Sequence, residues 1–305
     1  MSDIDIILDA AARWRGARMA LATVVSTWGS APRPAGSHMV MHEDGRFEGS
    51  ISGGCVEGDI LHAAAQVIAD GSARVQRYGV TDASAWEVGL PCGGEIAVLV
   101  QPVAEGGFAP ELFERIRAAR IAGESLSIAT DFATGLSVEG GEGDFVNRYL
   151  PPRRLLIVGA VQTAQTLADL ALAVGVRPVI IDPRARFLTP ERFPGLELDD
   201  AWPDQAIASR RPDESTAVVT LSHDPKIDDP ALVAALAAPT AYVAALGSRR
   251  SHAARLDRLT ALGVAQADLV RIEGPAGLAI GAVGTAEIAL SIAAGMVAAF
   301  NRSVR

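Results

Sequence analysis

Each of the two cysteines in the chain lies beside a pair of glycines. Cys55 follows one pair and Cys92 precedes the other; the pairs are Gly53 with Gly54 and Gly93 with Gly94. The residues around Cys55 predict a strand that passes through the glycines into a helix. Glycines in such a turn let backbone N–H groups face outward, and a helix N-terminus adds partial positive charge, so the turn suits an anion. The same field favours the thiolate of Cys55, ready to ligate or attack. An ordinary tight turn with a small buried cysteine fits the segment equally well.

The second thiol loop favours one shared site. Two glycine-flanked thiols that meet explain the pattern better than two unrelated turns, so we expect Cys55 and Cys92 in one pocket as candidate catalytic residues. Paired thiols suit a soft metal or sulfur chemistry. Zinc would need further ligands, and the nearest candidates are His38 and His42. No metal is assigned on this pattern alone.

A loop of small residues, 29–37, carries a single arginine, Arg33. Between two predicted strands it is typical of a binding loop, in which Arg33 would clamp a phosphate or a pterin oxygen. An ordinary proline-glycine connection with a solvated arginine is the alternative.

The chain divides near residue 150. The glycine-rich, acidic stretch Gly140–Asp144, followed by Pro151, has the composition of a linker. We therefore expect two domains, 1–150 and 151–305.

The second half alternates short apolar runs with helical patterns. Predicted strands are 155–158, 179–181, 217–221 and 242–246, and predicted helices are 164–173, 231–236, 251–262 and 288–300. This spacing predicts an α/β fold, a Rossmann-like doubly wound parallel sheet.

The first half is less regular and predicts a mixed α+β domain. Helices are expected at 4–15 and 56–69, and strands at 18–25, 37–41, 46–51 and 95–100. Glu43-Asp44-Gly45 predicts a hairpin turn between two of these strands.

Composition excludes several classes of protein. Of the 305 residues 49% are apolar and 21% charged, which excludes disorder. A net charge of −9 argues against a nucleic-acid or acidic membrane surface. The most apolar run, 288–300, is shorter than the ~20 residues that span a bilayer. The N-terminus lacks signal-peptide features, so we expect a cytoplasmic protein.

Three motifs of the first half, in order, resemble the XdhC/CoxI family, the maturation factors of xanthine dehydrogenase and carbon monoxide dehydrogenase. They are Gly29-Ser30-Ala31-Pro32-Arg33-Pro34-Ala35-Gly36, Ser52-Gly53-Gly54-Cys55-Val56-Glu57 and Gly89-Leu90-Pro91-Cys92-Gly93-Gly94. In the second half, Ser222-His223-Asp224, Leu246-Gly247-Ser248-Arg249-Arg250 and Ile280-Gly281 agree with the family's C-terminal Rossmann domain. The resemblance implies binding of molybdenum cofactor by Arg33, Gly53, Gly54, Cys55, Glu57, Cys92, Gly93 and Gly94, with the thiols near the molybdenum or its dithiolene.

The first turn of the Rossmann-like half departs from the family pattern. Gly-x-Gly-His is replaced by Gly159-Ala160-Val161-Gln162, and the branched Val161 is expected to obstruct a pyrophosphate. Asp182 stands where a ribose-binding acid would lie, but Arg184 could neutralise it. Gly159, Asp182, Ser248 and Arg249 are the candidate ligand residues of this half, and NAD(P) binding is expected to be poor.

The resemblance implies an accessory factor that binds molybdenum cofactor and assists its sulfuration and its insertion into a xanthine dehydrogenase-type hydroxylase. The expected partners are the apo-hydroxylase and a cysteine desulfurase, with a homodimer as the expected assembly. The alternative is an NAD(P)-dependent oxidoreductase that uses the Rossmann-like half, an interpretation that rests on fold analogy alone.

Overall fold

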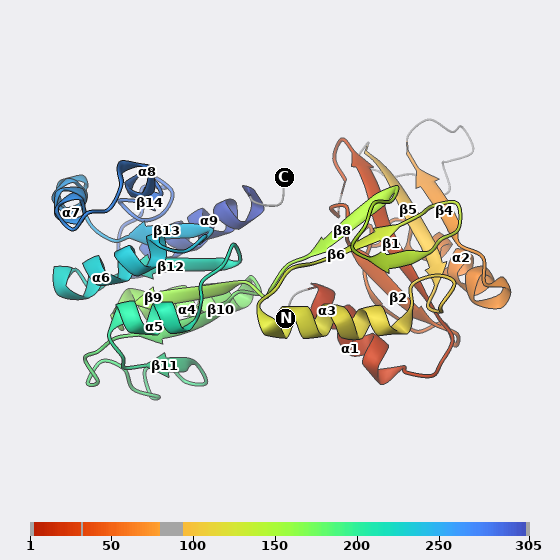
Figure 1. The fold of residues 1–305 in the computed structure, drawn as a ribbon, viewed down its shortest axis with the longest axis horizontal. Coiled ribbons are helices and arrows are strands. Elements are labelled where there is room, and N and C mark those ends of the chain that lie inside the picture. The colour runs from red at the N-terminus through yellow and green to blue at the C-terminus, as the bar shows by residue number, and fades with distance from the viewer. Residues whose placement is uncertain (1–2, 32, 80–93, 303–305) are drawn as a thin grey trace. The chain divides into compact units, whose positions relative to one another are not determined.

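The structure, a computed structural model, describes residues 3–31, 33–79 and 94–302. The chain divides into two compact units, Met1–Pro151 and Pro152–Arg305. Among the helices of the described residues, none is long and apolar enough to cross a membrane. Figure 1 shows the elements of both units.

The first unit is built on a five-stranded antiparallel sheet with the order β3-β2-β1-β5-β4. The strands are β1 (Met19–Trp28), β2 (His38–His42), β3 (Phe47–Gly49), β4 (Arg74–Tyr78) and β5 (Glu95–Pro102). The predicted hairpin joins β2 to β3, and Gly45 of its turn adopts the positive φ of +91° that glycine tolerates.

Alternate residues of β1 face two different layers. Ala20, Ala22 and Val24 pack with α2 (Glu57–Asp70), whereas Met19 and Leu21 pack with α1 (Asp3–Arg13) and α3 (Pro110–Ala122). The central strand is therefore buried on both faces. The helix α2 ends at Gly71, whose left-handed conformation lets its N–H bond to the carbonyl of Val67.

A second, three-stranded sheet completes the unit. It has the order β7-β6-β8, with β6 (Leu126–Thr130), β7 (Ser137–Glu139) and β8 (Phe145–Tyr149). The prediction that Gly140–Asp144 forms a linker between domains is wrong. This stretch connects β7 to β8 across the sheet, and Gly140 forms a bridge with Ile128. A glycine-rich connection inside a domain has the same composition as a linker.

The second unit confirms the predicted doubly wound parallel sheet. Its strands are β9 (Arg154–Val158), β10 (Arg177–Ile181), β11 (Glu197–Asp199), β12 (Thr216–Thr220), β13 (Tyr242–Ala245) and β14 (Ile272–Glu273). All pairs are parallel and the order is β11-β10-β9-β12-β13-β14. Numbered along the chain this is 3-2-1-4-5-6, the Rossmann order, whose ligands bind at the carboxyl edge where the order reverses.

Helices cover both faces of this sheet. One face packs against α4 (Gln162–Ala173) and α9 (Thr285–Arg302), and the other against α5 (Pro203–Ser209), α6 (Pro225–Leu236), α7 (Arg249–Ala261) and α8 (Gln266–Leu269). The apolar run 288–300 thus lies in a helix that packs on α4 (Figure 1).

Candidate functional site

The loops that follow β1 and β3 leave the five-stranded sheet from the same edge. β1 ends at Trp28, which pairs with Glu95 at the start of β5, and β3 ends at Gly49, beside the start of β2. Neighbouring strands run in opposite directions, so the described residues of segments 29–37 and 50–56 lie at this edge together with Gly94, the one described residue of the third motif.

Contacts bring two of these segments together. Gly94 lies so close to the loop after β1 that a Cβ atom on it would stand 2.6 Å from the carbonyl oxygen of Ser30. Ala31 packs against the apolar core that contains Ile51 and Val56. Cys92 and Gly93 lie outside the described residues, so the prediction that Cys92 lies beside Cys55 stays a prediction.

The carboxylate of Glu57 organises the turn that precedes α2. It accepts hydrogen bonds from Ser50 Oγ (2.8 Å), Ile51 N (3.2 Å), Ser52 N (2.9 Å), Ser52 Oγ and Gly54 N (2.8 Å). The turn folds around a carboxylate from its own chain. The Gly53 N–H group donates to Ser50 Oγ at 3.0 Å. The prediction that backbone N–H groups at the glycines face outward is therefore wrong for Gly53 and Gly54.

These bonds hold Glu57 in its charged form. Burial by itself opposes the charge, but hydrogen bonds from Ser52 and Ser50 outweigh burial and lower the pKa of Glu57 from 4.5 to about 2. The carboxylate is thus bonded to its own turn, and the role of Glu57 as a direct cofactor ligand stays a prediction. The sequence signal that could have revealed the turn is an acid three residues after Gly54, a spacing similar to that of a capping box.

Cys55 projects from this fixed turn. The helix α2 begins at Glu57, one residue after the predicted start, and Cys55 is exposed with a free thiol. Gly53 and Gly54 have φ values of +74° and +113°, and a Cβ on either would meet no atom within 4 Å. Backbone conformation, and not lack of space, therefore requires glycine at these positions.

Arg33 does not join the Cys55 turn through any bond that the described residues show. Its guanidinium pairs with Asp3 at the start of α1, and its Nε is buried without a hydrogen-bond partner. The predicted role of Arg33 as a clamp would require it to leave this pair. Asp59, in the first turn of α2, accepts a hydrogen bond from the Tyr78 hydroxyl at 2.5 Å.

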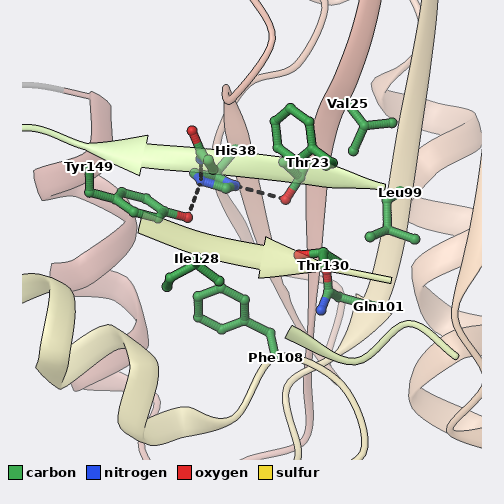
Figure 2. A pocket seen from close by; sticks show the side chains of 11 residues that line it. Thr23, Val25, His38, Leu99, Gln101, Phe108, Ile128, Thr130 and Tyr149 are labelled. Carbon is green, nitrogen blue, oxygen red and sulfur yellow. Dashed lines mark hydrogen bonds between the residues drawn. The ribbon is translucent and has the colours of Figure 1, made fainter. Parts of the chain in front are cut away.

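His38 lies in the interior, between the two sheets (Figure 2). Thr23 Oγ1 contacts its Nδ1 at 2.9 Å, and the Tyr149 hydroxyl and Asn147 Nδ2 lie 2.9 and 3.1 Å from its Nε2. Burial lowers its pKa from 6.5 to about 4. The cavity at this point has about 10 Å³ of free volume, close to the size of one water.

This geometry corrects the zinc alternative for His38, because both ring nitrogens already have partners. In the described part of the chain, no three His, Cys, Asp or Glu side chains gather as a metal site. His42 lies against Asp44 and the ring of Trp14.

In the second unit, Gly159 and Asp182 lie at the carboxyl edge of the sheet. Gly159, with φ of +105°, follows β9, and a Cβ on it would stand 2.7 Å from the Ser222 nitrogen. The carboxylate of Asp182 accepts from Ala160 N (2.7 Å) and from Arg184 N, Nε and Nη2 (2.9, 2.9 and 2.8 Å). Burial opposes the charge of Asp182, but these bonds outweigh it and lower the pKa. The oxygens that a ribose would need are thus used internally.

Val161 provides no obstruction that the structure shows. Its side chain packs against the apolar core beneath the turn, and its N–H bonds to the Gly159 carbonyl at 2.9 Å. Poor NAD(P) binding stays a prediction, and the structure gives it another basis: the Ala160 and Val161 amides and the Asp182 carboxylate already have partners within the turn.

Ser248 and Arg249 lie at the same edge, at the end of β13. Ser248 caps α7 by accepting a hydrogen bond from Ser251 N at 3.1 Å. Arg249 and Arg250 are exposed, and neither forms an ion pair within the described residues, so the alternative pairing with Asp257 is not seen. His223, after β12, has a φ of +61°, which is uncommon for a residue other than glycine.

Known proteins share both units. The family model described as "XdhC and CoxI family" matches residues 12–79, and that of the "XdhC Rossmann domain" matches residues 155–296. The molybdenum cofactor insertion chaperone PaoD of Escherichia coli (strain K12) is 34% identical over 283 residues, which cover 90% of this chain and 81% of PaoD. The chain belongs to the XdhC and CoxI family.

Other relatives of this family member cover nearly its whole length. A probable xanthine dehydrogenase component of Bacillus subtilis (strain 168) is 26% identical over 91% of this chain and 92% of its own. A crystal structure described as that of a xanthine dehydrogenase from Bacillus halodurans superposes with a TM-score of 0.78 at 26% identity, over 100% of this chain and 97% of that one. The family resemblance of the motifs is thereby confirmed.

Proposed function

We propose that this XdhC-family protein is a maturation factor that binds molybdenum cofactor and inserts it into a xanthine dehydrogenase-type hydroxylase. The observation that carries the proposal is Cys55, an exposed thiol on a turn whose polar groups are already bonded to Glu57. The named role of the relative PaoD as an insertion chaperone supports it.

In this proposal, Glu57 positions the turn and Cys55 binds the cofactor. Glu57 fixes the turn through hydrogen bonds, so Cys55 is presented in one place while its sulfur makes no hydrogen bond that the described residues show. A thiol is a soft ligand and suits molybdenum or the sulfur chemistry of its dithiolene. Gly53 and Gly54 carry no side chains, which leaves the face beside the thiol open to a bulky cofactor.

The second thiol completes the proposed site. We propose that Cys92 and Gly93 lie beside Cys55, because Gly94 contacts Ser30 at the edge from which the Cys55 turn also leaves. Arg33 would join by exchanging Asp3 for an anionic group of the cofactor.

Further parts of the proposal concern partners. We propose that the protein assists sulfuration of the cofactor, with the sulfur supplied by a cysteine desulfurase. We also propose a cytoplasmic homodimer that contacts the apo-hydroxylase directly.

Cofactor retention tests the proposal against the oxidoreductase alternative. Pure protein is incubated with released molybdenum cofactor and, separately, with NAD and NADP, and each mixture is passed through a desalting column. We expect the cofactor to elute with the protein and both nucleotides to be lost. Retained nucleotide without retained cofactor would favour the oxidoreductase and contradict the proposal.

A further inference from the structure

The turn between β13 and α7 has donors without acceptors. Ser248 N-caps the helix through Ser251, while the described residues offer no acceptor to the backbone N–H groups of Arg249 and Arg250. Both arginine side chains are exposed and unpaired within the described residues. The first turn of α7 holds no acidic residue, so nothing in it neutralises the positive end of the helix.

A buried arginine lies beneath this turn. Arg255 is 4% exposed, and its Nη2 donates to the Leu246 carbonyl at 2.8 Å. A Cβ on Gly247, which has a φ of +147°, would stand 3.6 Å from the same Nη2. The guanidinium therefore contacts the backbone of Leu246 and Gly247, directly before Ser248 and the start of α7.

The charge of Arg255 lacks a contacting counter-ion. Its Nε is buried without a hydrogen-bond partner, and no carboxylate of the described residues forms an ion pair with it. The two nearby carboxylates are engaged elsewhere: Asp229 with Arg258 (2.6 and 2.9 Å) and Asp228 with Ser222 Oγ (2.7 Å). The guanidinium contacts neutral groups, the Leu246 carbonyl through Nη2 and His252 Nδ1 at 3.4 Å from Nη1. A buried cation without a contacting counter-ion is costly, and an anion bound above it would offset that cost.

A second buried polar atom lies at the same edge. Thr220, the last residue of β12, is fully buried and its Oγ1 has no hydrogen-bond partner. Alternation along the strand places Thr220 on the face of Val218, the face that α6 and α7 cover. Thr220 pairs with Ala245 at the end of β13, directly before the turn.

We propose that the turn Leu246–Arg250 binds the phosphoryl group of a phosphate-bearing ligand. The free backbone N–H groups and the Arg249 and Arg250 side chains contact the phosphate, while Arg255 contributes its charge from below. The turn lies at the carboxyl edge at which parallel sheets bind ligands, one strand away from the reversal of strand order between β9 and β12. That the phosphate belongs to the molybdenum cofactor rests on the proposed function; the anion site itself does not.

Calorimetry with inorganic pyrophosphate tests the site. We expect the unmodified protein to bind it, and the double variant Arg249→Ala, Arg250→Ala to bind at least about tenfold more weakly. Both side chains are exposed, so the variant should fold. The matched control is Arg177→Ala, Arg302→Ala, which removes the same charge from exposed residues at the amino end of β10 and the last turn of α9. No binding by the parent protein, or an equal loss in both double variants, would overturn the proposal.

Displacement of the bound pyrophosphate identifies the source of the phosphate. Displacement by released molybdenum cofactor and not by NAD assigns the site to the cargo. Displacement by NAD alone assigns it to a dinucleotide and overturns the assignment to the cargo. Activation of an apo-hydroxylase is measured separately. Loss of activation with normal pyrophosphate binding would contradict the proposed function alone, and loss of pyrophosphate binding would contradict the anion site.

Discussion

Glu57 takes the place that an external anion has in other glycine-rich turns. Five hydrogen bonds from Ser50, Ile51, Ser52 and Gly54 converge on one carboxylate. Bonds of this kind to a charged group are each stronger than neutral ones, and a group buried without them is costly. The chain itself therefore holds the turn in one conformation, which our proposal requires for presenting Cys55 in a single position.

Glu57→Gln should destabilise the first unit by about 2–3 kcal/mol, because the amide replaces an acceptor oxygen by a donor that faces other donors. Chemical denaturation measures the loss of unfolding free energy, and hydrogen exchange of segment 50–60 shows whether the loss lies in this turn. Asp59→Asn, in the same helical turn, removes the charge from an acid that accepts a hydrogen bond from Tyr78 and should cost less. Equal losses in the two variants would contradict the organising role of Glu57.

The pH dependence of Glu57 has a defined sign. Its folded pKa of about 2 lies below the ordinary 4.5, so its contribution to stability is complete above pH 4.5 and is lost as the pH falls toward 2. The difference corresponds to roughly 3 kcal/mol. In Glu57→Gln, the loss of unfolding free energy between pH 4.5 and 2 that Glu57 causes should disappear. If stability falls with pH below 4.5 as steeply in the variant as in the parent protein, the assignment to Glu57 is wrong.

Cys55→Ala should abolish or strongly weaken retention of molybdenum cofactor and leave the fold intact. The thiol is exposed, so its removal should change stability by no more than about 0.5 kcal/mol. Cofactor that co-elutes with the protein is quantified beside circular dichroism of each variant. Ser26→Ala is a matched exposed-position control on β1 and should retain the cofactor. Undiminished retention by Cys55→Ala would show that the thiol does not bind the cofactor.

At the scale of elements, His38 joins strands that are distant in sequence. Its ring contacts Thr23 of β1 and Tyr149 and Asn147 of β8, and so connects the two sheets of the first unit (Figure 2). The neutral ring suits this position because a buried charge would lack a carboxylate partner among these contacts.

Acid should loosen this connection. The folded pKa of His38 is about 4 against 6.5 in the unfolded chain, so its contribution is complete above pH 6.5 and is lost as the pH falls toward 4. The loss corresponds to roughly 3 kcal/mol. Hydrogen exchange of β1, β2 and β8 at pH 7 and pH 5 should show it, and His38→Gln should reduce the difference. Exchange that is independent of pH, after correction for the intrinsic rate, would contradict the assignment.

In the turn after β9 of the Rossmann unit, the polar groups that a nucleotide would need already bond to one another. Asp182 holds Ala160 and Arg184, so we expect NAD and NADP to bind more weakly than about 100 µM by calorimetry. Arg184→Ala frees acceptor positions on Asp182 and should strengthen NAD binding, whereas Val161→Gly should not, because Val161 packs in the core. Micromolar binding by the parent protein, or a gain only in Val161→Gly, would contradict this basis.

The sequence predicts the second unit better than the first, for a physical reason. Strands of a parallel sheet are buried on both faces, so 155–158 and 179–181 are continuous apolar runs in the sequence. The short elements β11, β14 and α8 have too few residues for a periodic signal. In the first unit, the strand order depends on pairings between distant segments, and the apolar and polar residues of β8 do not alternate with its alternating exposure.

The candidate site was predictable in its backbone and not in its side-chain partners. Gly53, Gly54 and Cys55 define the turn by residue type alone. The spacing of Glu57 three residues after Gly54 is a local signal, but it does not show that the carboxylate accepts hydrogen bonds from Ser50, Ile51 and Ser52 as well. Arg33 meets Asp3, 30 positions away in sequence. Composition alone also made Gly140–Asp144 look like a linker. Contacts between distant residues decide each of these cases.

At the scale of the whole molecule, two compact units carry two kinds of site. The first unit presents the Cys55 thiol on a turn whose N–H groups donate to Glu57. The second unit presents the turn Leu246–Arg250 at the carboxyl edge of its sheet. The glycine turn after β9 in that sheet donates to Asp182. Both glycine turns thus hold a carboxylate of the chain itself. In our proposals, recognition of the cofactor therefore falls to Cys55 and to Arg249 and Arg250.

Activation of an apo-hydroxylase tests the central claim most directly. The purified protein is loaded with molybdenum cofactor, desalted and mixed with cofactor-free xanthine dehydrogenase-type enzyme, and the recovered enzyme activity is compared with that given by the same amount of free cofactor. We expect at least about tenfold more recovery with the loaded protein, and recovery no better than with free cofactor for Cys55→Ala. Equal recovery from the loaded protein and from free cofactor, or full recovery with Cys55→Ala, would contradict it.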